Sequence, residues 1–321
     1  MIRIGIDLGG TFIKAGTLDK ESNLLSEETV PTMVAKGGDF VVKNMATVIC
    51  SVLKKSGHRI EEVQGIGIGC PGVIDQKRGI VLYSNNFDWN CFHVIEKIEK
   101  LIPADYAIAN DGKCAVLGEQ IAGAGQGCDN LILLTLGTGV GCGIISGGKL
   151  FEGGSIGGGI AGHMVIRHGG ETCTCGRNGC LEAYASATAL IRETRKLFEN
   201  HDEIVVHLCM GNPTNITGQT VFLASAQGDK KAMEVIQRYI EFLGDGIANL
   251  IDIFRPEKVL LGGGICNEGE KLFAPLNEYI RRNCFASDIL DVPPVKQALL
   301  GNKAGIIGAA SLIGEKNEQG I

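Results

Sequence analysis

The sequence contains no block of five or more basic residues, although it holds 30 lysines and arginines. Aspartates and glutamates number 36, so the formal net charge at pH 7 is −6. A surface that binds nucleic acid is usually a basic patch or stripe, because the phosphate backbone is negatively charged. We therefore expect that this protein does not bind nucleic acid.

Long apolar runs are missing as well. The longest, such as NLILLTL at 130–136, stop at glycines and fall far short of the ~20 residues that a membrane-spanning helix needs. The first residues, IRIGIDLGG, carry Arg3 and Asp7 and so lack the apolar core of a secretion signal. We predict a cytoplasmic protein without membrane contact.

Disulfides are not expected either, despite twelve cysteines. Most of them stand singly in apolar segments of a long chain without a secretion signal, which favours reduced thiols. Free cysteine is often fully buried. We expect this of Cys50, Cys70, Cys114, Cys142 and Cys209. Only the cluster between 173 and 180 departs from the pattern.

The apolar residues that are present alternate between strand and helix periods. They predict an α/β fold, and 321 residues suffice for two domains. The segment 3–32 predicts a meander of antiparallel strands. Apolar residues three and four apart predict an amphipathic helix over 38–55. A buried strand at 63–75, a helix at 93–102 and a strand at 106–111 follow.

The second half begins as the first half does. Residues 130–150 again predict a strand, a glycine turn and a strand, which indicates an internal duplication. Helical patterns fill 183–197 and 229–253, and the polar segment at about 200–219 between them has little periodicity. A buried strand follows Pro256, and a last helix of small residues at 302–313 is expected to cross back to the first domain. We place the domains at 1–112 plus about 302–321, and at 113–301.

Three glycine-rich turns each end an apolar strand: DLGGT at 7–11, LGTGVG at 136–141 and LGGGI at 261–265. Glycines let backbone amides approach phosphate oxygens closely, and a threonine hydroxyl adds a donor. Asp7 can hold Mg²⁺, usually through water. A tight hairpin alone explains one such turn, whereas three together favour phosphate binding. None is a Walker sequence or a dinucleotide fingerprint, which excludes P-loop and Rossmann sites.

A possible catalytic base follows the strand at 106–109. Asn110 and Asp111 stand at its carboxyl end, where α/β sheets usually bind ligands. An aspartate there can take a proton from a hydroxyl that attacks phosphorus. The alternative is that Asp111 only caps a helix that starts at Lys113.

The cysteine cluster has the composition of a metal site. Cys173, Cys175 and Cys180 with one histidine suit tetrahedral zinc, and GRNG between the cysteines supplies a tight turn. Four protein ligands leave no position for a catalytic water, so the zinc would be structural. The fourth ligand is His163 or its rival His168. The alternative is a disulfide between Cys180 and one of the other two cysteines.

The motifs, taken in order, resemble those of the ROK family of sugar kinases, repressors and related open reading frames. The resemblance is carried by IGIDLGGTFIKAG, GIGCPGVID, AIANDGKCAVLGE, LLTLGTGVGCGII, the glycine-rich stretch ending at Gly162 and His163, CTCGRNGCLE and VLLGGGI. It implies two actin-like (ribonuclease H-like) ATPase domains with an interdomain cleft. It also implies ATP with Mg²⁺ as cosubstrates, a sugar or polyol hydroxyl as acceptor, and a homodimer.

The resemblance assigns roles to matching residues. It makes Asp111 the general base and His163, rather than His168, the fourth zinc ligand. It points to four sugar contacts: Asn110, His163, Glu182 and, with a less close match, Asn86. The residues that it places around ATP are Asp7, Gly9, Gly10 and Thr11 in the first phosphate motif, Gly137, Thr138 and Gly139 in the second, and Gly263 and Gly264 beside the adenosine.

One position departs from the family pattern. The residue three before the zinc histidine is usually a glutamate that binds sugar hydroxyls, and here it is Ile160. A sugar hydroxyl buried against Ile160 would lose a hydrogen bond, at a cost of about 1 to 3 kcal/mol. We therefore predict an ATP-dependent kinase whose acceptor is another hexose, a modified sugar or a cyclic polyol, and not plain glucose.

The alternatives to a kinase are a transcriptional repressor and a sugar sensor. A ROK repressor carries a DNA-binding helix-turn-helix before the first phosphate motif, but only six residues precede Asp7 here. We therefore expect no DNA-binding domain. A sugar sensor that neither binds DNA nor transfers phosphate is the other alternative, because of Ile160.

Overall fold

The structure is a computed structural model that describes residues 1–154 and 156–318. The chain forms two compact units, of which the first consists of Met1–Asp129, Gly143–Gly159 and Ala298–Ile321. The second consists of Asn130–Cys142 and Ile160–Gln297. The bounds differ from those of the predicted domains. Of the C-terminal segment assigned to the first domain, residues 319–321 lie outside the described residues.

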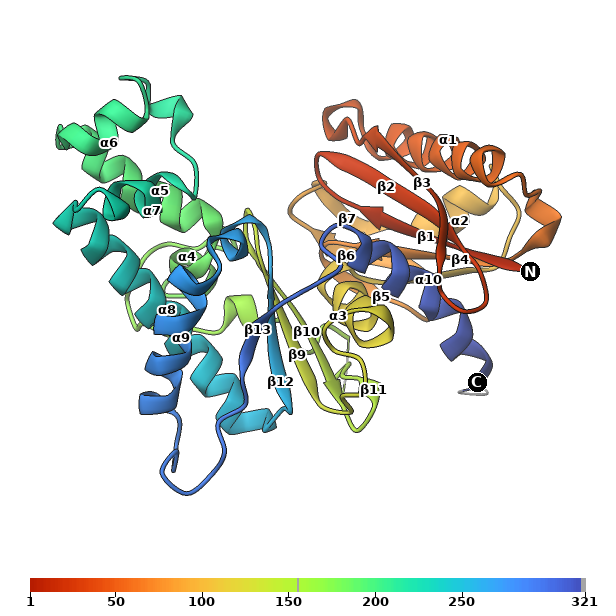
Figure 1. Ribbon diagram of the computed structural model, residues 1–321. Coiled ribbons are helices and arrows are strands. Elements are labelled where there is room, and N and C mark those ends of the chain that lie inside the picture. The colour runs from red at the N-terminus through yellow and green to blue at the C-terminus, as the bar shows by residue number, and fades with distance from the viewer. Residues whose placement is uncertain (155, 319–321) are drawn as a thin grey trace. The chain divides into compact units, whose positions relative to one another are not determined.

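The first unit is built on a five-stranded sheet of order β3-β2-β1-β4-β8 (Figure 1). Strands β1 (Ile2–Leu8), β2 (Phe12–Leu18) and β3 (Leu24–Pro31) form the expected antiparallel meander. Strands β4 (Val63–Cys70) and β8 (Tyr106–Asn110) extend the sheet parallel to β1. The carboxyl ends of β1, β4 and β8 therefore meet at one edge of the sheet.

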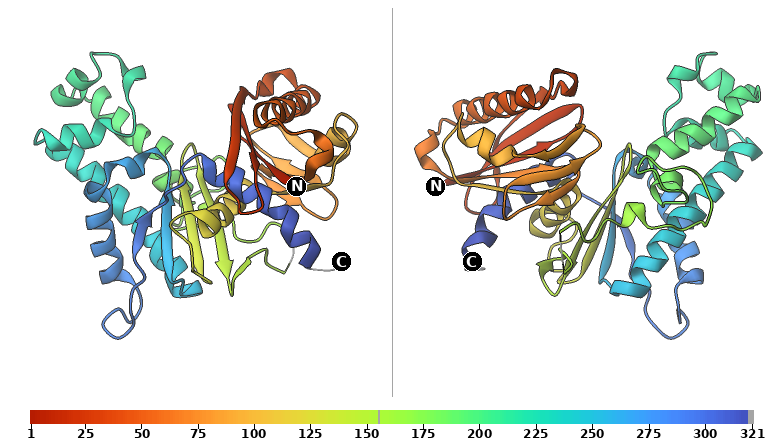
Figure 2. Two further views of the ribbon diagram at one scale, coloured as in Figure 1. Left: turned by 45° about the vertical axis from the view of Figure 1, so that its right-hand side comes forward. Right: turned by 180° about the vertical axis from the view of Figure 1, so that it is seen from behind.

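Helices cover both faces of this sheet. Helix α1 (Gly38–Ser56) packs on β2 and β3 through buried residues three and four apart, and Gly57 ends it in a left-handed conformation. Helices α3 (Asp111–Ala122) and α10 (Lys303–Glu318) lie on the opposite face (Figure 2). Because α3 packs against α10, it belongs to the first unit and does not begin the second.

Helix α10 approaches the sheet unusually closely. A Cβ atom on Gly5 of β1 would lie 1.9 Å from the carbonyl oxygen of Ile306, and one on Gly67 of β4 would lie 1.7 Å from that of Ala309. No real Cβ contact is so short, so these two glycines allow the helix backbone to rest directly on the strands.

The sequence did not predict a smaller sheet of order β5-β6-β7 in the first unit. It consists of β5 (Val73–Asp75), β6 (Ile80–Ser84) and β7 (Trp89–Phe92), and α2 (Val94–Glu99) follows. The strand expected over 63–75 is broken after Cys70, where Pro71 and Gly72 leave the large sheet. These strands are too short for a clear period of two, which is why they were missed.

A second five-stranded sheet has the order β11-β10-β9-β12-β13. Strands β9 (Leu131–Leu136), β12 (Lys258–Gly262) and β13 (Val295–Gln297) are parallel. Strand β10 (Val140–Ser146) forms an antiparallel hairpin with β11 (Lys149–Leu150). Helices α8 (Lys230–Phe254) and α9 (Glu270–Asn283) pack against each other beside the parallel strands (Figure 1).

The remaining helices of the second unit precede α8. They are α4 (Glu182–Ala185), α5 (Ala187–Glu199), α6 (Glu203–Leu208) and α7 (Thr220–Ala226). The single helix expected over 183–197 is interrupted at Ser186, whose hydroxyl accepts a hydrogen bond from the Ala189 amide and begins α5. The polar segment after it contains α6. Short 3-10 helices lie at Val34–Lys36, Ile60–Glu62, Ala161–His163, Pro213–Asn215 and Gly264–Glu268.

All twelve cysteines are free. Cys70, Cys114, Cys142 and Cys209 are buried as predicted, but the prediction for Cys50 is wrong, since it lies on the exposed side of α1. Among the described residues, no helix combines the length and apolar character needed to cross a membrane.

Candidate active site and metal centre

The first glycine turn follows β1 in the first unit. The Gly9 amide donates a hydrogen bond to the Phe12 carbonyl oxygen at 3.0 Å, and the Thr32 hydroxyl donates to the Gly9 carbonyl oxygen at 2.6 Å. Gly10 and Thr11 are exposed at the tip of the turn. The turn is therefore fixed at its base and open to a ligand at its tip.

Asp7 lies just before this turn. Burial raises the pKa of its carboxyl, and the ammonium of Lys14, 3.6 Å away, opposes the rise. A Cβ atom on Gly305 of α10 would lie 3.0 Å from the Asp7 carboxyl carbon, so that glycine makes room for the carboxylate. Sequence reasoning missed both neighbours. Lys14 stands directly opposite Asp7 in the β1–β2 pair, a relationship that depends on the register of the two strands.

Asn110, not Asp111, caps α3. Its Oδ1 atom accepts hydrogen bonds from the amides of Gly112, at 2.9 Å, and Lys113, at 3.4 Å. Its Nδ2 group donates to the Gly72 carbonyl oxygen at 3.1 Å. The alternative role for Asp111 as a helix cap is thus filled by its neighbour, and the helix begins at Asp111 itself.

Asp111 occupies the environment of a tuned acid–base group. Burial raises the pKa of its carboxyl to about 6, the Gly112 amide opposes the rise with a hydrogen bond of 2.9 Å, and the negative charge of Asp7 adds to it. A carboxyl with a pKa near the working pH can exchange a proton efficiently. The arrangement can therefore accept a proton from a bound hydroxyl.

The carboxylates of Asp7 and Asp111 also fit a hard divalent cation. Mg²⁺ prefers carboxylate and water oxygens and usually keeps several of its waters. The Asp7 side chain is 22% exposed, which leaves room for a water between it and an ion. The donor set therefore suits Mg²⁺ at Asp7.

Asn86 lies in the turn between β6 and β7, close to the first glycine turn. A Cβ atom on Gly10 would lie 3.8 Å from the Asn86 Cβ atom and 3.9 Å from its Nδ2 atom. The missed three-stranded sheet thus brings Asn86, which is exposed, to the same edge as Asp7.

The second and third glycine turns adjoin each other in the second unit. Strands β9 and β12 are parallel, with Thr135 opposite Gly262. Gly263 has a φ of 107°, and a Cβ atom on it would lie 2.1 Å from the carbonyl oxygen of Leu136. Only glycine therefore fits where the third turn, with Gly264, meets the second.

The second turn leaves its tip open. Its base is closed by a hydrogen bond of 3.0 Å from the Gly137 amide to the Gly139 carbonyl oxygen, and Ala187 of α5 donates to the Gly137 carbonyl oxygen at 2.9 Å. Thr138 is exposed. Its hydroxyl and the free amides of the turn can bind an anion.

The four predicted zinc ligands converge. One ligand atom from each of His163, Cys173, Cys175 and Cys180 lies within 4.8 Å of all the others. Sulfur atoms bound to one zinc at ~2.3 Å lie about 3.8 Å apart in a tetrahedron, and the Sγ atoms of Cys175 and Cys180 are 3.7 Å apart. The Cys173 Sγ atom is 3.5 Å from Nδ1 of His163. These distances fit zinc.

The alternatives for this cluster fit less well. A disulfide requires sulfur atoms ~2.05 Å apart, and the pair at 3.7 Å is not bonded. His168 is not in the converging group. Arg177, which the sequence did not single out, donates to the His163 carbonyl oxygen and lies 3.9 Å from the Cys180 sulfur. Its positive charge favours thiolates, which are the form that binds metal.

Glu182 joins the loop at 164–181, which carries the three cysteines and is called the metal loop below, to the second glycine turn. Its Oε1 atom accepts a hydrogen bond from the Thr174 hydroxyl at 2.8 Å, and its Oε2 atom accepts one from the Val140 amide at 3.0 Å. A Cβ atom on Gly139 would lie 2.3 Å from Oε2. The carboxylate predicted to contact sugar therefore rests on the predicted phosphate turn, and Gly139 makes that contact possible.

Ile160 is not a core residue. Its side chain is 43% exposed, and its carbonyl oxygen accepts a hydrogen bond from the His163 amide at 3.2 Å. The backbone thus ties Ile160 to the zinc histidine and leaves its side chain accessible. The nearest acid in the preceding loop, Glu152, is bound to Lys113 and, at 2.6 Å, to Gln76 of the first unit.

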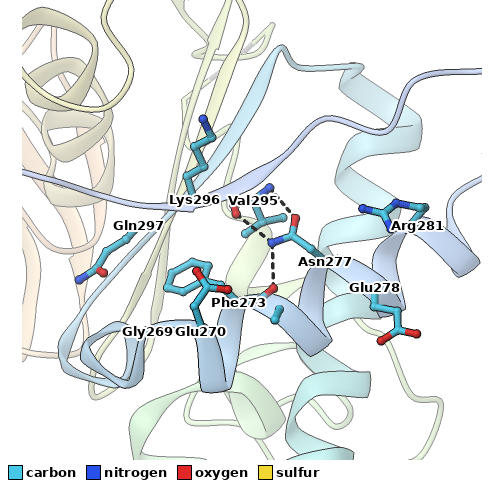
Figure 3. Close-up of a pocket in the computed structure, with 10 residues that line it drawn as sticks. Gly269, Glu270, Phe273, Asn277, Glu278, Arg281, Val295, Lys296 and Gln297 are labelled. Carbon is cyan, nitrogen blue, oxygen red and sulfur yellow. Dashed lines mark hydrogen bonds between the residues drawn. The ribbon is translucent and has the colours of Figure 1, made fainter.

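A cavity of about 670 Å³ lies between α9 and β13 and is lined by no predicted site residue. Figure 3 shows Asn277 beside the strand edge, where it accepts a hydrogen bond from the Val295 amide and donates one to the Val295 carbonyl oxygen. Asn277 thereby occupies the backbone groups of the outermost strand. This groove plays no part in the candidate site.

Comparison with known proteins agrees with the motifs. A model of the ROK family matches residues 3–316. A glucokinase of Thermotoga maritima is 38% identical over 98% of this chain and 97% of its own. The crystal structure of a ROK glucokinase from Streptomyces griseus with glucose and AMPPNP is 35% identical, with a TM-score of 0.84 over 97% of this chain and 99% of that one.

A regulator is also similar. A xylose repressor of Caldicellulosiruptor bescii is 29% identical over 97% of this chain and 77% of its own length. The family model spans nearly the whole chain, and the predicted α/β fold class with two actin-like domains is confirmed by the likeness to ROK kinase structures. The chain belongs to the ROK family.

Proposed function

We propose that this protein is an ATP-dependent kinase that phosphorylates a hydroxyl of a sugar or cyclic polyol. The observation that carries the proposal is the position of Asp111 at the carboxyl edge of the first sheet, with a pKa raised to about 6. The similarity to glucokinases, one of them solved with glucose and an ATP analogue, supports it.

In the proposed reaction the acceptor oxygen attacks the γ-phosphorus of ATP. The bond from that phosphorus to the oxygen bridging it to the β-phosphate breaks, ADP leaves, and the hydroxyl proton passes to Asp111. The turns at 9–11 and 137–139 bind phosphate oxygens through backbone amides and threonine hydroxyls, and Gly263 and Gly264 lie by the adenosine. Asp7 would hold Mg²⁺, which neutralises charge on the phosphates.

The sugar contacts in this proposal are Asn110, His163, Glu182 and Asn86. The zinc held by His163 and the three cysteines would be structural and fix the loop that ends at Glu182. Ile160 would face the acceptor, because its side chain is exposed beside His163. We propose an acceptor that lacks or reorients the hydroxyl that a glutamate would bind, and a homodimer in the cytoplasm.

A panel of hexoses, N-acetylated sugars, keto sugars and cyclic polyols with ATP and Mg²⁺ tests the proposal by measuring ADP formation. Asp111→Asn should lower kcat about 10²-fold or more while acceptor binding, measured by calorimetry, is kept. Asp105→Asn is the matched control, since this exposed aspartate stands just before the same strand. Full activity in Asp111→Asn would contradict the mechanism.

A second candidate is a sugar-responsive regulator without phosphoryl transfer, which the similarity to the xylose repressor favours. It predicts acceptor binding without ADP formation for every member of the panel.

A further inference from the structure

A second cavity, of about 140 Å³, lies in the second unit away from the glycine turns. It is formed by α4, α5, α8 and the loop that carries the cysteines. We propose that this cavity binds the phosphate group of a small phosphorylated metabolite.

The cavity is basic in an acidic protein. Its wall carries four cationic side chains, Arg167, Arg192, Lys196 and Arg238, and two acidic ones. The whole chain has a net charge of −6. A local excess of positive charge in such a chain concentrates anions at this cavity.

One of the two acids, Glu193, forms ion pairs with two of the cations. Glu193 accepts hydrogen bonds from Lys196 at 2.9 and 3.0 Å and from Arg192 at 3.1 Å. Burial works against ionisation of Glu193, but these hydrogen bonds outweigh it and lower the pKa of the carboxyl. Arg192 is also held by a 2.9 Å hydrogen bond to the Ala183 carbonyl oxygen. This side of the cavity is therefore a fixed frame in which one carboxylate is shared by two cations, so its net charge stays positive.

The other two cations, Arg167 and Arg238, are available to bind a ligand. Within residues 1–154 and 156–318, the structure pairs neither Arg167 nor Arg238 with a carboxylate. Both side chains are exposed and line the cavity from different elements, the metal loop and α8. Two guanidinium groups from different elements suit a phosphate group, because each can donate two parallel hydrogen bonds to its oxygens.

The floor supplies an aromatic surface and one more donor. The rings of Tyr184 and Phe242 lie 4.3 Å apart. The Tyr184 hydroxyl accepts a hydrogen bond from the Glu171 amide at 2.6 Å, so its own proton remains for a ligand. The nearby Tyr239 hydroxyl already donates to the Ala185 carbonyl oxygen at 2.8 Å. A ligand with an organic part beside its phosphate would therefore use the floor as well as the arginines.

Calorimetry on the zinc-loaded full chain tests the site with two probes, glucose 6-phosphate and inorganic phosphate. Saturating AMPPNP and Mg²⁺ are included, so that neither probe is measured at the glycine turns. We expect saturable binding of the phosphate ester, tighter than that of inorganic phosphate. Arg167→Ala and Arg238→Ala should each weaken it about fivefold to tenfold, the loss expected for an exposed charged hydrogen bond.

Arg195→Ala is the matched control, because this exposed arginine lies on α5 outside the cavity and its loss changes the net charge equally. It should leave the dissociation constant unchanged, and circular dichroism checks that every variant is folded. Absence of ester binding, ester binding weaker than that of inorganic phosphate, or equal losses in Arg195→Ala and Arg238→Ala would overturn the proposal. The proposal does not depend on kinase activity, which the ADP assay measures separately.

Discussion

The Oε2 atom of Glu182 accepts a hydrogen bond from the backbone amide of Val140 at 3.0 Å. The other carboxylate oxygen is held by Thr174, one residue from two of the cysteines. One carboxylate therefore connects the metal loop with the turn proposed to bind ATP phosphates. A residue expected to bind only sugar also positions the turn that we propose to bind nucleotide.

Replacing this carboxylate should therefore weaken nucleotide binding. Glu182→Gln replaces the charged acceptor of the Val140 amide with a neutral amide oxygen, which accepts a weaker hydrogen bond, so the turn is held less firmly. We expect the dissociation constant of AMPPNP to rise about threefold to tenfold, measured by calorimetry without sugar. Glu199→Gln, an exposed glutamate on α5, is the control. Unchanged AMPPNP binding would limit Glu182 to contact with the sugar.

The pH dependence of the rate should report Asp111. A general base acts as the carboxylate, and the pKa of Asp111 in the folded protein is about 6. The rate should therefore be level above pH 7 and fall about tenfold for each pH unit below 6. Measurement of kcat/KM from pH 5 to 8 tests this. A profile that stays level down to pH 5 would show that Asp111 does not titrate in this range.

Lys14→Met should move this profile to lower pH. Lys14 opposes the rise in the pKa of Asp7, and the charge on Asp7 in turn raises the pKa of Asp111. Without Lys14, Asp7 is protonated more readily and its neutral form no longer raises the pKa of Asp111. Mg²⁺ bound at Asp7 would oppose this protonation, so the shift should be larger at low Mg²⁺. The same pH series at two Mg²⁺ concentrations measures the shift. A profile that changes neither with Lys14→Met nor with Mg²⁺ would show that the charge on Asp7 does not affect the pKa of Asp111.

Metal analysis should find about one zinc per chain. Cys175→Ser removes one of the four converging ligands and should leave less than half of that zinc after dialysis. Cys50→Ser is the matched control, because Cys50 is an exposed thiol on α1. Mass spectrometry of metals measures both. Less than about half a zinc in the unaltered protein after mild handling would contradict the site.

Acceptor choice should depend on residue 160. Ile160→Glu restores the hydrogen-bond acceptor usual in ROK kinases and should raise kcat/KM for glucose about tenfold to hundredfold relative to the best native acceptor. Ile156→Glu is a close control, since this isoleucine is 49% exposed and Ile160 is 43% exposed. An unchanged preference in Ile160→Glu would mean that residue 160 does not face the acceptor.

The site residues with strong local patterns could be found from the sequence, and the rest could not. The three cysteines of the proposed zinc site follow from their spacing, because they are close together in one loop, whereas spacing alone left the choice between His163 and His168 open and the family resemblance favoured His163. The missed contributors, Lys14, Gly305 and Thr174, act through partners that only pairing or folding brings near. Lys14 meets Asp7 across a strand pair, and Gly305 comes from a helix almost three hundred residues away. A sequence motif contains no information on the contact of Asp7 with either Lys14 or Gly305.

The return of α10 to the first sheet affects when the first unit can complete its folding during biosynthesis. The backbone of this helix rests on Gly5 and Gly67, which the ribosome makes long before it. Until translation reaches residue 303, the face of the sheet that α10 covers has no partner from its own unit. The first unit, which is the first to be synthesised, is therefore the last to complete its folding. A nonsense mutation just before α10 would leave the uncovered face of its sheet open to chaperones and proteases.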